Sequence, residues 1–272
     1  MNEAVKEFSE KYRICDAHAH IFPDKIAEKA TSAIGSFYDI KMSTVAGSIE
    51  ELKKSGSSIG VSRYLVCSTA TTAHQVESIN EFIIKACASN PEFVGFGTLH
   101  PEFKDISVQV DYCIQNGLKG IKLHPDFQIF NIDDKSAYPI YECVAGKLPI
   151  LFHIGDNRYD FSSPVRLKKV LSDFPKLTAF AAHFGGYRKW KESAELFKDQ
   201  KNVFFDTSSS LPFISAQDAR NLINIYGPER MFFGCDFPMW QHQDEIEKFM
   251  SLKLSDKENK IILSENFDNF FK

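Results

Sequence analysis

The 272-residue sequence has no long apolar run, no Cys-x-x-Cys pair and no low-complexity linker. Without an unbroken apolar stretch of about 20 residues, no bilayer-spanning helix is expected. The charged segment 1–13 lacks the apolar centre of a secretion signal. The six cysteines have neither metal-site nor redox spacing, so we expect free thiols, mostly buried, in a cytoplasmic protein.

An excess of one charge is also missing. The chain has 32 Lys and Arg against 36 Asp and Glu, a formal net charge of −4. This mild value excludes a nucleic-acid binder that works through a bulk positive field. We therefore expect a small-molecule partner rather than nucleic acid or membrane, and the sequence leaves a homo-oligomer open.

Eight short apolar runs do recur along the chain, separated by polar loops and amphipathic stretches. Most are rich in β-branched or aromatic residues, as buried parallel strands are. The runs cover residues 14–19, 64–68, 93–99, 120–123, 150–154, 177–182, 203–206 and 231–235.

The stretches between these runs predict helices. One carries Ile49 and Leu52 and is expected to be capped by Ser43 and Thr44. The others cover residues 71–90, 106–116, 136–146, 164–174, 186–199, 215–226 and 244–252. Strands that alternate with helices imply a parallel sheet, and eight units favour a closed (β/α)8 TIM barrel. The count alone leaves an open doubly wound sheet as the alternative.

This pattern predicts a single domain of α/β class. Residues 1–13 are expected to form an N-terminal helical extension, and residues 14–272 the barrel. His74 and His242 fall on predicted helical segments, and we expect both at the surface.

Polar residues fall at the ends of several predicted strands. His18 and His20 share one face of the first strand, because side chains alternate with period two. His153 ends the fifth strand, His183 the sixth and Asp236 the eighth. In a closed barrel the carboxyl ends of the strands gather at one mouth. Imidazoles and a carboxylate gathered there predict a metal site with a position left open for water or substrate. A single strand-end histidine is more often structural, so the prediction depends on their joint placement.

Five motifs carry a further resemblance. They are Asp16-Ala17-His18-Ala19-His20, Gly120-Ile121-Lys122-Leu123-His124-Pro125, Phe152-His153-Ile154-Gly155, His183-Phe184-Gly185-Gly186 and Phe233-Gly234-Cys235-Asp236-Phe237-Pro238. In this order they resemble the amidohydrolase superfamily. They are most similar to its amidohydrolase-related branch, which also contains non-oxidative decarboxylases of aromatic acids. The resemblance extends from about residue 14 to the C-terminus.

The resemblance implies that His18, His20 and His153 bind a divalent metal and that Asp236 is the carboxylate at that metal. It implies that His183 is a catalytic imidazole, which could also touch a second metal. Zn²⁺ is the first choice for such donors, and Mn²⁺ and Fe²⁺ are also compatible.

Lys122 departs from the pattern of many two-metal members, which carry a carboxylated lysine or a glutamate at the end of the fourth strand. Lys122 is either carbamylated or an ordinary cation aimed at substrate or an acid. Lys122 and His124 share a face of the predicted strand, and with Arg158 they are the predicted substrate-binding residues. Arg158 could clamp a carboxylate or lie on the surface. Residues 208–210 are expected to contact substrate, to form a turn or to cap the next helix. Asp16 is expected to orient a ligand histidine or to pair with Lys122.

These residues favour a metal-dependent hydrolase acting on an amide, ester or lactone of a small molecule. Asp236 would orient a metal-activated water and take its proton, and His183 would polarise a carbonyl. The same ligands also suit a non-oxidative decarboxylase of a small carboxylic acid, including aromatic ones. A non-enzymatic barrel with a structural metal is a third interpretation, which the open coordination position disfavours.

Overall fold

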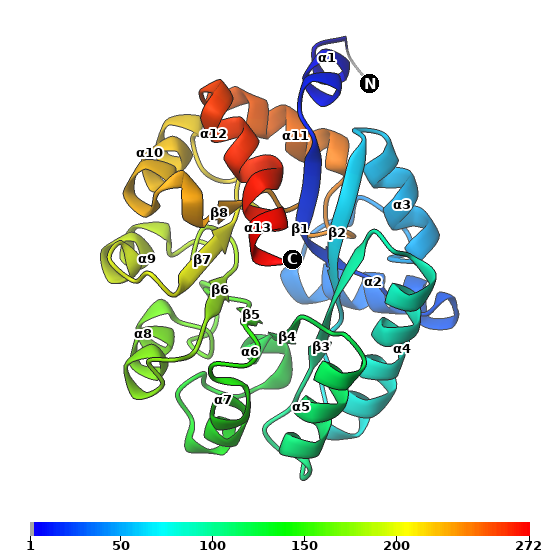
Figure 1. Cartoon of the computed structure of the whole chain (residues 1–272), viewed down its shortest axis with the longest axis vertical. Helices are drawn as coiled ribbons and strands as arrows, with labels where there is room; N and C mark the ends of the chain where they lie inside the picture. Colours follow the sequence, from blue (N-terminus) through cyan, green and yellow to red (C-terminus); the bar gives the residue numbers. More distant parts are fainter. Residues whose placement is uncertain (1–2) are drawn as a thin grey trace. The chain divides into compact units, whose positions relative to one another are not determined.

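The computed structural model describes residues 3–272 (Figure 1). Strands alternate with helices along the chain, and the strand order is β1 to β8 without permutation. Within the described residues, no helix combines the length and apolar composition that crossing a bilayer would require. By its contacts the chain falls into two compact units, Met1–Val66 with Thr207–Lys272 and Cys67–Asp206.

The first unit contains the two ends of the chain. Its elements are α1 (Glu3–Lys11), β1 (Ile14–His20), α2 (Asp24–Tyr38), α3 (Ile49–Ser57), β2 (Val61–Cys67), α10 (Ala216–Tyr226), η3 (Pro228–Arg230), β8 (Met231–Phe232), α11 (His242–Ser251), α12 (Asp256–Lys260), the π-helical turn η4 (Ile261–Glu265) and α13 (Asn266–Phe270). Strand β1 is buried along its whole length. Its backbone runs parallel to the segment after β8, since Ala17 N donates to Phe233 O over 2.8 Å and His20 N to Phe237 O over 2.7 Å.

Helix α3 begins later than its predicted cap. Ser48, not Ser43 or Thr44, is the N-cap, and its hydroxyl accepts from the Glu51 N–H over 3.2 Å. Ser48 has the extended backbone angles typical of an N-cap residue. Two acidic residues follow it in the first turn, where their negative charge interacts favourably with the positive end of the helix dipole. The predicted cap was therefore wrong by one turn or more.

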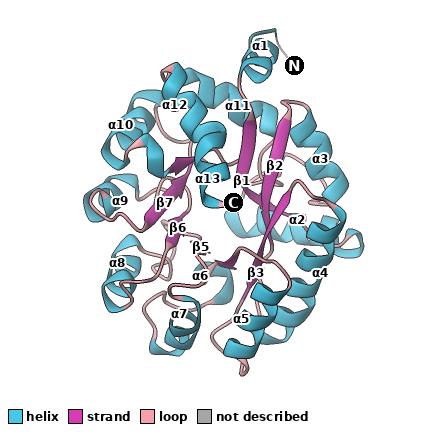
Figure 2. Ribbon diagram, viewed as in Figure 1, coloured by secondary structure: helices cyan, strands magenta, loops and turns pink. Residues whose placement is uncertain are grey.

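The second unit contains a row of parallel strands. Its elements are η1 (Ala73–Gln75), α4 (Val76–Ser89), β3 (Phe93–Thr98), α5 (Ile106–Gln115), β4 (Gly120–Leu123), α6 (Pro125–Gln128), η2 (Lys135–Ala137), α7 (Tyr138–Val144), β5 (Ile150–Phe152), α8 (Pro164–Asp173), β6 (Ala179–Ala181), α9 (Trp190–Phe197) and β7 (Val203–Asp206). The register of the three neighbouring strands β4, β5 and β6 is defined at Ile150 of β5, which lies opposite Ile121 of β4 and Ala179 of β6. Figure 2 shows the helices α4, α5, α7, α8 and α9 along the outer side of these strands, as in βαβ crossovers.

Several strands end earlier than their apolar runs predicted. Strand β5 ends at Phe152, β6 at Ala181 and β8 at Phe232. His183 and Asp236 follow these ends with φ of 63° and 62°, in the left-handed region that non-glycine residues rarely adopt. Their side chains are therefore aimed by turns and not by the strand pleat, so the period-two argument applies directly only to β1.

Candidate metal centre

Three predicted ligands meet within the first unit. His18 and His20 project from the same face of β1, with ring centroids 5.2 Å apart. The Nε2 atoms of His18 and His20 lie 3.6 and 3.3 Å from the Asp236 Oδ1 atom. All three residues are buried. Two imidazole nitrogens and one carboxylate oxygen therefore converge on one small volume.

Two serines of the segment after β7 hold these ligands. The Ser208 hydroxyl lies 3.1 Å from His18 Nδ1, which leaves Nε2 as the nitrogen that faces Asp236. The Ser209 hydroxyl donates to Asp236 Oδ2 over 2.5 Å and accepts from the Trp240 indole N–H over 2.9 Å. The indole thus directs the Ser209 proton toward the carboxylate. Residues 208–210 form a turn, as one of the expectations had it, and from this turn Ser208 and Ser209 contact His18 and Asp236, which the sequence did not predict.

The backbone behind these ligands is fixed by a buried acid. Asp16 Oδ1 accepts from the N–H of His18 over 3.0 Å and from the N–H of Cys235 over 2.9 Å. Asp16 Oδ2 lies 2.9 Å from His242 Nε2, and His242 Nδ1 lies 2.8 Å from the Ser55 hydroxyl. His242 is fully buried, so its predicted surface position was wrong. It begins α11 and is turned inward by its two partners.

This donor set fits a divalent cation. Metal–nitrogen and metal–oxygen bonds of about 2 Å place neighbouring ligand atoms roughly 3–4 Å apart, as the Nε2 and Oδ1 atoms are here. His18 and Asp236 also have outer hydrogen-bond partners in Ser208 and Ser209, as metal-binding histidines and carboxylates usually have. Imidazole and carboxylate donors suit Zn²⁺, Mn²⁺ and Fe²⁺.

His153 and His183 lie in the second unit and contact each other. His153 Nδ1 is 3.0 Å from His183 Nε2, and His153 Nε2 is 2.9 Å from the Gly155 carbonyl. Because a carbonyl only accepts, His153 carries its proton on Nε2, and His183 donates to Nδ1. The backbone of His183 is held by Asp206, whose Oδ1 accepts the His183 N–H over 3.1 Å. Ligation by His153 would require one of its two ring contacts to break, and its place in the ligand set remains a prediction.

The predicted substrate-binding residues of β4 are buried. Lys122 is 1% exposed, and His124 follows β4 directly. The His124 ring lies in a parallel stack between Phe127 and His153, with centroid distances of 3.7 and 4.0 Å. His124 Nδ1 accepts the Phe127 N–H, so the His124 side chain also caps α6.

The Arg158 guanidinium forms an ion pair with Asp156. Its Nε atom donates to Asp156 Oδ1 over 2.9 Å and its Nη2 atom to Asp156 Oδ2 over 2.6 Å. A substrate carboxylate would have to compete with this two-point pair.

Asp126, at the start of α6, is buried beside His153, with 3.8 Å between its Oδ2 atom and His153 Nε2. Burial raises the pKa of its carboxyl to about 6, Asp156 adds to the rise, and the Ser162 hydroxyl opposes it.

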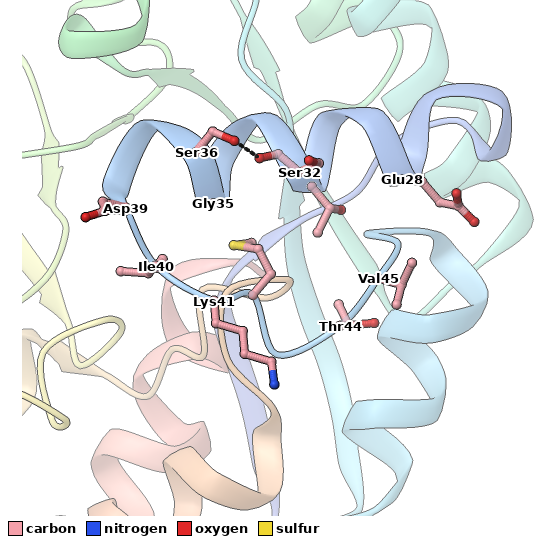
Figure 3. Close-up of a pocket in the computed structure, with 11 residues that line it drawn as sticks. Glu28, Ser32, Gly35, Ser36, Asp39, Ile40, Lys41, Thr44 and Val45 are labelled. Atoms are coloured by element: carbon pink, nitrogen blue, oxygen red, sulfur yellow. Dashed lines mark hydrogen bonds between the residues drawn. The ribbon is translucent and has the colours of Figure 1, made fainter.

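A surface cavity of about 620 Å³ lies in the first unit between α2 and the following loop (Figure 3). Its described lining contains none of the predicted site residues. It is formed by Glu28, Thr31, Ser32, Gly35, Ser36, Asp39, Ile40, Lys41, Met42, Thr44 and Val45. The candidate metal centre is therefore separate from this cavity.

A family model described as amidohydrolase matches residues 15–267. The chain belongs to the amidohydrolase family. No curated protein matches the sequence significantly.

Solved structures show that the fold is a (β/α)8 TIM barrel. An uncharacterised TIM-barrel protein from Bordetella bronchiseptica is 17% identical, with a TM-score of 0.77 over 95% of this chain and 98% of that one. A dihydroxybenzoic acid decarboxylase from Polaromonas sp. JS666, with bound manganese and the inhibitor 2-nitroresorcinol, is 15% identical, with a TM-score of 0.72 over 96% and 97%. A probable 2-pyrone-4,6-dicarboxylic acid hydrolase from Acinetobacter baumannii, with citric acid bound, is 15% identical, with a TM-score of 0.70 over 95% and 99%. Both lyases and hydrolases thus share this architecture.

Sequence reasoning missed several residues around the centre of this amidohydrolase family member. His242 was placed on the correct helix, but nothing in the local pattern marks its inward orientation. Trp240 carried no motif. The run of three serines was noticed, and its position directly after a predicted strand was the usable signal.

Proposed function

We propose that this chain is a metal-dependent hydrolase that cleaves an amide, ester or lactone bond of a small molecule. The observation that carries the proposal is the convergence of His18 Nε2 and His20 Nε2 on Asp236 Oδ1, at 3.6 and 3.3 Å. A carboxylate and two imidazoles held in this way form an incomplete coordination set, which leaves room for a reacting group.

When bound, the divalent metal supplies Lewis acidity, polarising a substrate oxygen and lowering the pKa of a water molecule toward 7. The protein supplies orientation and proton transfer. Asp236 accepts the proton at its carboxylate, while Ser209 keeps that carboxylate in one orientation. Ser208 orients the His18 ring through its contact with Nδ1. Zn²⁺ is our first choice, and the manganese in the similar decarboxylase supports Mn²⁺ as the second.

Residues of the second unit complete the proposal. The strands of a (β/α)8 barrel end at a common mouth, so we retain His153 as a further metal ligand and His183 as the group that stabilises charge on a carbonyl oxygen. Lys122, His124 and Arg158 remain proposed contacts of the substrate. We also propose a cytoplasmic location, in keeping with six free thiols, and a homo-oligomer remains an expectation.

Replacing both His18 and His20 with alanine tests the ligand assignment. We expect the variant, purified without chelator, to lose its bound metal in elemental analysis and its turnover of amides and lactones. His74→Ala, an exposed histidine outside the centre, is the matched control and should keep both. Unchanged metal content in the double variant would show that the ligands lie elsewhere.

A non-oxidative decarboxylase is the second candidate, and the similarity to a manganese-containing dihydroxybenzoic acid decarboxylase favours it. The two reactions differ in their products. Incorporation of ¹⁸O from labelled water into the product supports hydrolysis, whereas release of CO₂ from a hydroxylated aromatic acid supports decarboxylation. A screen of amides, lactones and hydroxylated aromatic acids therefore separates them.

A further inference from the structure

The turn after β6 contains three consecutive residues in the left-handed region. His183, Phe184 and Gly185 have φ of 63°, 54° and 82°. Only the third is a glycine, and a left-handed run is unfavourable for residues that carry a Cβ atom. Such strain persists only where the surrounding structure holds the chain in place. The contacts that hold this turn therefore determine where the His183 imidazole points.

Asp206, the last residue of β7, holds the N–H groups of the turn. Its Oδ1 atom accepts from His183 N over 3.1 Å, and its backbone carbonyl accepts from Phe184 N over 2.8 Å. Asp206 is buried, so water does not compete strongly for these bonds. The two bonds fix the amide groups of the turn but not its carbonyl groups.

Two side chains of α9 hold the carbonyl groups. The Trp190 indole N–H donates to the His183 carbonyl over 3.0 Å, and the Ser193 hydroxyl donates to the Gly185 carbonyl over 2.7 Å. Trp190 and Ser193 are three positions apart, so they project from the same face of the helix. Ser193 is fully buried, and a Cβ atom built on Gly186 would lie 2.5 Å from its hydroxyl oxygen. The backbone of the turn thus passes very close to this side chain.

The same turn directs the His183 ring at His153. His183 Nε2 donates to His153 Nδ1 over 3.0 Å. Rotation of His183 out of the left-handed region would move both its Cβ atom, which carries the ring, and the carbonyl that Trp190 holds. The orientation of the imidazole is therefore coupled to the contacts with α9.

We propose that Trp190 and Ser193 are positioning residues for His183. They act through the left-handed turn that carries the imidazole, and not as reacting groups. The proposal rests on the proposed function only for its kinetic test, in which His183 stabilises charge on a carbonyl oxygen. Because that contact is made in the transition state, its misalignment should lower kcat more than it raises KM.

Exchange of the His183 ring proton with water tests the orientation without any substrate. The full chain, ¹⁵N-labelled in its histidine rings, is studied without metal, because ligation of His153 would compete with the contact. The Nε2–H signal of His183 is identified by its loss in His183→Gln. We expect this proton to exchange at least about ten-fold faster in Trp190→Phe and in Ser193→Ala, since each variant lacks one hydrogen bond that holds the turn.

Ser78→Ala is the matched control, because the Ser78 hydroxyl also donates to a backbone carbonyl, but on the exposed side of α4. Its exchange rate should equal that of the wild type. Trp190→Phe keeps an aromatic ring in place, so loss of packing is small. Unchanged exchange in both variants would overturn the proposal, as would a wild-type proton that exchanges too fast to observe.

A double-variant cycle separates positioning from general damage. With a compound that the wild type turns over, Trp190→Phe should lower kcat about ten-fold and change KM by less than about two-fold. In a His183→Gln background the same substitution should lower kcat no further, because the imidazole that it positions is gone. An equal loss in both backgrounds would mean that Trp190 acts on the fold in general, and would overturn the proposal.

The two proposals fail separately. If no amide, lactone or hydroxylated aromatic acid is turned over, the proposed function fails, while exchange of the His183 proton still tests the positioning residues. If turnover is found but Trp190→Phe and Ser193→Ala change neither kcat nor exchange, only the positioning proposal fails.

Discussion

At the scale of single residues, the metal centre depends on side chains that hold the proposed ligands in place but take no part in the proposed reaction. Ser209 connects the Trp240 indole to Asp236, so that its proton has one favourable direction. Ser209 itself has φ of 50°, in the left-handed region. Backbone strain of this kind persists where the surroundings hold a residue in place, and here the place is beside a metal ligand.

Ser209→Ala should weaken metal binding by about 10–100-fold, because Asp236 loses the contact that orients it. Competition with a chromophoric chelator would measure the dissociation constant for Mn²⁺ or Zn²⁺. Trp240→Phe keeps the Ser209 hydroxyl but not the indole donor, and we expect a smaller loss in the same direction. Ser172→Ala, on the exposed side of α8, is the control. Equal affinities in all four proteins would leave Ser209 without a positioning role.

At the scale of elements, the turn after β5 determines how His153 lies. Gly155 has φ of 84° and supplies the carbonyl that accepts from His153 Nε2. A Cβ atom added to Gly155 would lie 2.5 Å from the Tyr187 carbonyl oxygen and 2.7 Å from the Tyr187 nitrogen. These are backbone atoms, and the Tyr187 N–H donates a hydrogen bond to the Ile154 carbonyl over 2.7 Å. Moving them away from a new Cβ would therefore cost free energy.

Gly155→Ala should therefore lower the free energy of unfolding by about 2–4 kcal/mol, as strain and clash add. Gly60→Ala is a matched control, because Gly60 has φ of 69° but open space where a Cβ would lie. We expect the control to lose only about 1 kcal/mol, the cost of the left-handed backbone. Urea unfolding of both variants measures the difference, and similar losses would rule out a clash at Gly155.

The sequence predicts elements better than it predicts turns. The alternation in β1 placed His18 and His20 on one face correctly, because a buried strand has a fixed pleat. His183 and Asp236 were placed on strand ends, but they lie in left-handed turns beyond them. Turn geometry depends on partners from distant segments, such as Asp206 for His183, and local periodicity carries no information about these. The inward orientation of His242 was missed for the same reason.

At the scale of the whole molecule, one buried acid makes stability depend on pH. Glu245 on α11 is fully buried, its Oε2 atom has no hydrogen bond within residues 3–272, and Lys248 Nζ lies 3.4 Å from its Oε1 atom. Burial raises the pKa of Glu245 from 4.5 to about 8. Between these values the folded chain holds a proton that the unfolded chain releases, so stability falls as pH rises through that window.

Glu245→Gln should remove this dependence. We expect the variant to be more stable than the wild type at pH 8.5, by up to about 4 kcal/mol, with the difference shrinking toward zero near pH 4.5. Chemical unfolding at several pH values measures it. The exposed Glu247→Gln is the control, since its effect should not vary in this way. A constant difference between Glu245→Gln and wild type across the range would refute the buried proton.

The single oxygen of Asp16 that accepts from both His18 and Cys235 has a consequence for engineering. One atom there aligns two stretches of chain more than two hundred positions apart. Anyone transplanting the 233–238 loop into another barrel should expect a disordered graft unless Asp16 and its partner His242 are transplanted with it.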